Sequence, residues 1–85
     1  MTTFKMNDSY EVVCWGERTR YGFRHLAVLM KDGEEVCRDK VCYYNRTWER
    51  YTFETVLSNV IFKAHKQKIL SDELYEQFIN KIKNF

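Results

Sequence analysis

The chain has 85 residues and a net charge of +2, and 16% of its residues are aromatic. This length predicts a single domain over residues 1–85, and the aromatic content excludes an intrinsically disordered chain. The near-neutral charge disfavours an acidic mimic of nucleic-acid phosphates, and it is weaker than the charge of a dedicated DNA-binding domain.

Three runs rich in β-branched and aromatic residues predict three strands joined by short turns. The strands are expected at residues 10–15, 21–30 and 35–44, with turns at 16–20 and 31–34. Asp32-Gly33 is typical of a two-residue hairpin turn, because both positions require positive φ. Together these signals predict an antiparallel three-stranded meander.

The tight turn also predicts the register of the second hairpin, with Lys31 opposite Glu34. Counting back from the turn places these pairs on one face of the sheet: Leu29/Val36, Ala27/Arg38, His25/Lys40, Phe23/Cys42 and Tyr21/Tyr44. The other face would lie under the helices and carry Met30/Glu35, Val28/Cys37, Leu26/Asp39, Arg24/Val41 and Gly22/Tyr43. A slip of one residue between the two strands would exchange the faces.

From residue 52 the apolar period changes to that of an amphipathic helix. Thr52 is the predicted N-cap, and the apolar stripe consists of Phe53, Val56, Leu57, Val60, Ile61 and Ala64. Trp48 and Tyr51 are expected to fix this helix against the sheet. Ser71 is predicted to cap a second helix with apolar residues Leu74, Phe78, Ile82 and Phe85. The predicted fold class is therefore α+β, with the order βββαα.

Cysteine and histidine side chains are the candidates for catalysis or metal binding. The three cysteines, at positions 14, 37 and 42, lack C-x-x-C spacing, and the two histidines are far apart in sequence. We interpret the cysteines as buried reduced thiols, which indicates a reducing compartment, the cytoplasm. A thiol–imidazole pair of Cys14 or Cys42 with His25 is the alternative. We expect no enzymatic activity, no metal and no cofactor.

The absence of long apolar runs predicts that the protein does not associate with membranes. No run approaches the roughly 18 residues that span a bilayer, and the N-terminal segment lacks the apolar stretch of a signal peptide. We therefore expect a soluble protein without a membrane partner.

The sheet face that is predicted to point away from the helices gathers cationic and aromatic residues. The candidate binding residues are Arg18, Arg20, Tyr21, Phe23, Arg38, Lys40 and Tyr44. Tyrosine and arginine are frequent at protein–protein hot spots, so we expect a partner protein on this face. The same residue types also suit phosphate contacts and base stacking, which makes nucleic-acid binding the alternative. A homodimer through this face, or the second helix folded over it, would equally bury these residues.

The segment YYNRTWERYTFETVL, residues 43–57, resembles a signature in short uncharacterised proteins of phages and mobile elements in Gram-positive bacteria. The resemblance covers about fifteen residues. It implies a small accessory protein that binds a host protein, and anti-CRISPR inhibitors of host defence nucleases are one class of this size. It supplies no known activity that could be carried over to this chain.

Overall fold

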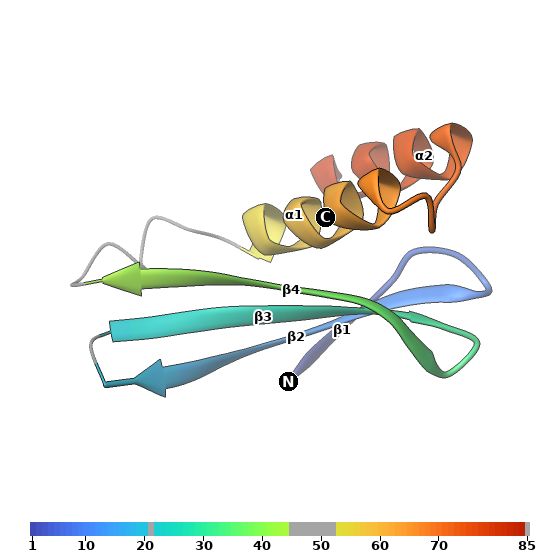
Figure 1. The fold of residues 1–85 in the computed structure, drawn as a ribbon. Helices are drawn as coiled ribbons and strands as arrows, with labels where there is room; N and C mark the ends of the chain where they lie inside the picture. Colours follow the sequence, from blue (N-terminus) through green and yellow to red (C-terminus); the bar gives the residue numbers. More distant parts are fainter. Residues whose placement is uncertain (21, 45–52, 85) are drawn as a thin grey trace.

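A twisted antiparallel sheet with two helices packed on one of its faces forms the domain (Figure 1). The computed structural model describes residues 1–20, 22–44 and 53–84, with the backbone alone for Tyr43, Tyr44 and Phe53. Within these residues the strands are β1 (Thr2–Lys5), β2 (Tyr10–Thr19), β3 (Gly22–Lys31) and β4 (Glu34–Tyr44), and they lie in the order β1-β2-β3-β4. The helices are α1 (Phe53–Lys66) and α2 (Asp72–Lys83). The predicted α+β class with two C-terminal helices is confirmed.

The prediction of three strands was wrong, because the described residues form four. β1 pairs antiparallel with β2, and Phe4 lies opposite Val12. The turn between them is built by Asn7, whose Oδ1 accepts hydrogen bonds from the N–H groups of Ser9 at 2.8 Å and Tyr10 at 2.7 Å. A four-residue strand carries too little alternation to be recognised by its period, although the cluster Asn7-Asp8-Ser9 is a turn signal.

The predicted hairpin at Asp32-Gly33 is present, with φ of 51° and 86° at the two turn residues. Lys31 pairs with Glu34 as expected, but the register shifts immediately afterwards. Met30 lies opposite Glu35 while Leu29 lies opposite Cys37, so Val36 is the extra residue of a β-bulge.

The bulge reverses the predicted orientation of β3 relative to β4. Leu29 and Ala27 belong to the core under the helices, together with Cys37 of β4. Leu26 and Val28 point to the other face, opposite Lys40 and Arg38. The expected pairs of Arg38 with Ala27 and of Lys40 with His25 are therefore wrong. Because positions 26–29 are all apolar, alternation within β3 could not reveal the error.

The core lies between the sheet and the helices. Its helical members are Val56, Leu57, Val60, Ile61 and Ala64 of α1, and Phe78 and Ile82 of α2. The helix α2 packs on α1 and on the turn after β1: the ring of Phe78 meets that of Tyr10 edge-on at 5.5 Å, and Lys81 Nζ donates to the C=O of Met6 at 3.0 Å. Both helices therefore occupy one side of the sheet, and α2 does not fold over the other (Figure 1).

The helix boundaries follow from local signals in the sequence. Ser71 is the N-cap of α2 as predicted, and its Oγ accepts a hydrogen bond from the N–H of Leu74 at 3.3 Å. Beyond the end of α1, Lys68 takes a left-handed φ of 62°, and Ile69 N–H bonds to the C=O of Ala64 at 2.9 Å. The predicted N-cap Thr52 and the predicted packing of Trp48 and Tyr51 lie outside the described residues.

Candidate protein-binding face

The sheet face turned away from α1 and α2, called here the open face, is the candidate site. Neither described helix lies over it (Figure 1). The strand register assigns to the open face Val13, Trp15 and Glu17 of β2, Arg24, Leu26, Val28 and Met30 of β3, and Arg38, Lys40 and Cys42 of β4.

An apolar centre is protected from water on this face without help from a helix. Leu26 is only 7% exposed and Val28 only 4%. Leu26 lies between Trp15 and Lys40 on the neighbouring strands, and Val28 lies between Val13 and Arg38. Long side chains can cover apolar neighbours with their hydrocarbon stems while their charged ends stay in water. The open face is therefore an apolar strip bordered by an indole and by cations.

Trp15 is held in place by an ionic network with Glu17 and Arg24. Its indole Nε1 donates to Glu17 Oε1 at 3.0 Å. Arg24 donates from Nε at 2.8 Å and from its terminal nitrogen at 2.5 Å to the other carboxylate oxygen. These two hydrogen-bonding partners, Trp15 and then Arg24, hold the pKa of the Glu17 carboxyl below its ordinary value, because they stabilise the charged form. A tryptophan fixed in this way loses little conformational freedom when it binds a partner.

The Glu17 network predicts a specific dependence of stability on pH. Because the folded-state pKa is depressed, the contribution of Glu17 is complete above the unfolded-state value of about 4.3 and is lost as the pH falls through the folded-state pKa. Glu17→Gln should remove this part of the acid sensitivity. Glu76→Gln, an exposed change on α2, should leave it intact. Urea unfolding at a series of pH values measures both, and identical pH profiles for wild type and Glu17→Gln would contradict the expectation.

The charges on β4 are only partly neutralised. Arg38 pairs with the nearby Glu35, with 2.7 Å between a terminal nitrogen and Oε1. Lys40 contributes its backbone N–H to a hydrogen bond with Asp39, but its ammonium group forms no ion pair with any residue that the structure describes. Lys40 is thus the cation on the open face that is best placed to meet a carboxylate of a partner.

The structure separates the residues that were predicted to form one patch. Arg38 and Lys40 lie on the open face as expected. Phe23 and Arg18 form a cross-strand pair on the opposite, helix-bearing side, where Phe23 meets His25 edge-on at 5.3 Å. The assignment of Phe23 to the same face as Arg38 was wrong, because the bulge at Val36 shifts the register between β3 and β4. Arg18 was expected in a turn, whereas it lies within β2.

The remaining predicted residues are placed only in part. Arg20 is exposed in the turn between β2 and β3. Tyr21 lies outside the described residues, and Tyr44 is described by its backbone alone, which pairs with Gly22.

Sequence reasoning missed Trp15, Glu17 and Arg24. A signal was present, since residues 15 and 17 share a face of any strand. Residues 16–20 had been interpreted as a turn, whereas β2 continues to Thr19 and brings Glu17 opposite Arg24.

The cysteines give little support to thiol chemistry. Cys14 and Cys37 are buried as predicted, whereas Cys42 is exposed, contrary to expectation. Burial raises the pKa of Cys14 to about 11, which disfavours the reactive thiolate. Cys42 lies opposite Arg24 on the open face, and His25 points to the other face. Within the described ranges, no group of His, Cys, Asp and Glu side chains is arranged to hold a metal ion.

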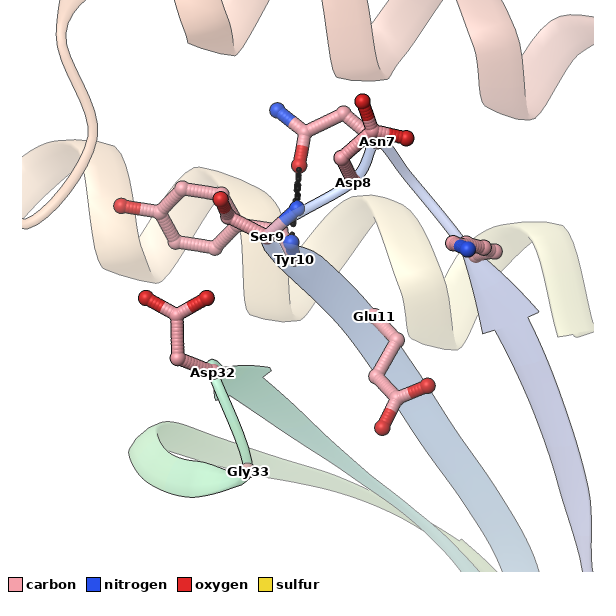
Figure 2. A pocket seen from close by; sticks show the side chains of 8 residues that line it. Asn7, Asp8, Ser9, Tyr10, Glu11, Asp32 and Gly33 are labelled. Carbon is pink, nitrogen blue, oxygen red and sulfur yellow. Dashed lines mark hydrogen bonds between the residues drawn. The ribbon is translucent and has the colours of Figure 1, made fainter.

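A hollow of about 180 Å³ lies where the turn after β1 meets the turn between β3 and β4 (Figure 2). It is lined by Lys5, Asn7, Asp8, Ser9, Tyr10, Glu11, Asp32 and Gly33. The Asn7 side chain bends back onto its own turn, and the Asp32 N–H donates to the C=O of Ser9 at 2.9 Å. These polar contacts hold the two turns together, so we interpret the hollow as a structural junction.

Comparison with known protein families, with curated proteins and with solved structures finds no match to this chain. Neither described helix combines the length and the apolar character that crossing a membrane requires.

Proposed function

We propose that this chain is a small non-enzymatic binding protein whose open face docks on a folded partner protein. The observation that carries this proposal is a sheet face that both described helices leave uncovered and that holds an ordered tryptophan over an apolar centre. Tryptophan and arginine are among the side chains most enriched at interface hot spots, and Trp15 shares the carboxylate of Glu17 with Arg24.

The charges of the open face suggest the chemistry of the partner. Among the described residues Lys40 forms no ion pair, whereas Arg24 pairs with Glu17 and Arg38 pairs with Glu35. A complementary surface would therefore present an apolar patch against Trp15 and a carboxylate opposite Lys40.

The resemblance of residues 43–57 to phage and mobile-element proteins supports a more specific form of this function. An accessory protein of that kind would act in the host cytoplasm on a host protein, and inhibition of a defence nuclease is one such action. This origin and this target are part of the proposal.

A capture experiment tests the docking surface. The chain is immobilised, and proteins retained from a Gram-positive bacterial lysate are quantified. Trp15→Ala should weaken capture of the same partner by about 30-fold, corresponding to about 2 kcal/mol for loss of a hot-spot residue. Lys40→Glu should weaken it most at low salt. Phe62→Ala, an exposed aromatic change on α1, should retain capture. Equal capture by Trp15→Ala and wild type would refute docking through the open face.

Nucleic-acid binding is the alternative outcome, and salt dependence distinguishes it. Phosphate groups would have to compete with Glu17 for Arg24 and with Glu35 for Arg38. We therefore expect weak binding when labelled DNA and RNA are titrated at low salt. Strong binding that falls steeply towards physiological salt would instead assign the face to nucleic acid.

A second copy of the chain is the other possible occupant of the open face. Light scattering of wild type and of Trp15→Ala over a concentration series tests it. A wild-type dimer that dissociates in the variant would assign the face to self-association.

A further inference from the structure

The outer side of β4 is the longest unpaired strand edge among the described residues. β4 is the last strand of the sheet and spans 11 residues, whereas β1 at the opposite edge spans 4 (Figure 1). An unpaired edge presents N–H and C=O groups on which an extended segment of another chain can add as a further strand. Whether these backbone groups of β4 are free therefore decides whether a partner can bind by adding a strand.

Two side chains form hydrogen bonds with backbone groups in the middle of β4. Asp39 Oδ1 accepts a hydrogen bond from the N–H of Lys40 at 2.9 Å. Lys63 Nζ, from α1, donates to the C=O of Arg38 at 2.7 Å. In a strand, the backbone groups of residues two positions apart point to the same side. The Lys40 N–H is directed to the side chain of its own neighbour, so this side is the outer edge.

We infer that Asp39 and Lys63 close the outer edge of β4 against strand addition. One backbone donor and one backbone acceptor that an incoming strand would need are already bonded. The exposed side chains of Arg38 and Lys40 add charge beside the same edge, which also opposes edge pairing. At the other edge, β1 is short, and the C=O of Met6 just beyond it accepts a hydrogen bond from Lys81.

For the proposed function, edge closure specifies the kind of partner. A protein that binds this domain does so with the side chains of a folded surface laid across the open face, with its carboxylates opposite Lys40. An extended peptide that paired with the middle of β4 would have to displace both of these contacts. Recognition therefore depends on Trp15 and Lys40, and not on main-chain hydrogen bonds to β4.

The first test measures exchange of the Lys40 amide hydrogen by NMR on the isolated protein. Asp39→Ala removes the acceptor and should speed this exchange about fivefold to tenfold, which corresponds to the loss of one hydrogen bond. Asp39→Asn keeps a carbonyl oxygen at the same position and should stay near wild type. Unchanged exchange in Asp39→Ala would overturn the inference.

The second test asks whether the opened edge pairs. Asp39→Ala combined with Lys63→Ala should self-associate at concentrations at least tenfold lower than wild type, as measured by light scattering. Asp39→Asn combined with Lys63→Arg should behave like wild type, because both contacts are retained. If the Asp39→Ala/Lys63→Ala variant folds and associates no more readily than wild type, the inference is overturned. If that variant does not fold, the amide exchange of the single variant decides.

These tests are independent of the capture experiment, because they use only the chain itself. Equal capture by Trp15→Ala and wild type, together with the expected edge response, would refute the proposed function alone. If capture depends on Trp15 but the Asp39 and Lys63 variants behave like wild type, only the inference of edge closure is refuted.

Discussion

Replacing Phe78 by alanine is expected to lower the free energy of unfolding by about 3–5 kcal/mol. Phe78 is 1% exposed, and its ring joins α2 to the sheet through an edge-on contact with Tyr10. A domain of this size has a total stability of about 5–15 kcal/mol, so this single truncation removes a large fraction of it. Urea unfolding followed by circular dichroism measures the loss.

Phe62→Ala is the matched control, since it makes the same chemical change on a helix surface. Phe62 is 50% exposed, and its ring meets that of Tyr75 at a centroid distance of 6.4 Å. Its truncation should cost about 1 kcal/mol or less. Equal losses for Phe78→Ala and Phe62→Ala would show that α2 does not pack as described.

Gly16→Ala is expected to destabilise the protein by about 1–3 kcal/mol, because a methyl group at this position of β2 would collide with the ring of Phe23 and force it to move. A Cβ at this position would lie 2.6 Å from Cε1 and 2.7 Å from Cζ of Phe23, and 3.1 Å from Cδ2 of His25. The aromatic ring of Phe23 therefore lies directly over Gly16 on the helix-bearing side of the sheet.

A double-mutant cycle separates this collision from other effects of the glycine. In a Phe23→Ala background the ring is absent, so adding Gly16→Ala should cost much less than it does in wild type. Urea unfolding of the two single variants and the double variant gives the coupling energy. Additive losses would mean that Phe23 does not cover Gly16, and would return Phe23 to the candidates for the open face.

The helices could be predicted from sequence because each carries its own signals. The apolar period of residues 53–64 places one stripe on the core whichever partner lies opposite. Ser71 caps α2 through a contact with Leu74, three residues along the chain. Such short-range interactions do not depend on the rest of the fold, and both helices begin and end close to the predicted residues.

The sheet was harder to predict because the strand register was obtained by counting residues from the turn, so one extra residue changes every later pair. One extra residue at Val36 exchanged the faces of β3 relative to β4. As a result Phe23 and Arg38, predicted neighbours, lie on opposite sides of the sheet. Trp15, which was not predicted as a binding residue, borders the apolar strip of the open face, because β2 continues past Gly16 and brings Glu17 opposite Arg24.

By itself the sequence determined the fold class, the hairpin at Asp32-Gly33 and the two C-terminal helices, because these follow from local conformational preferences and from the spacing of apolar residues. Only the tertiary structure decided which side chains share the open face and how the edge of β4 is closed. The open face depends on the strand register, and the closed edge depends in part on a contact between distant residues, Lys63 with the C=O of Arg38. No local pattern encodes either of them.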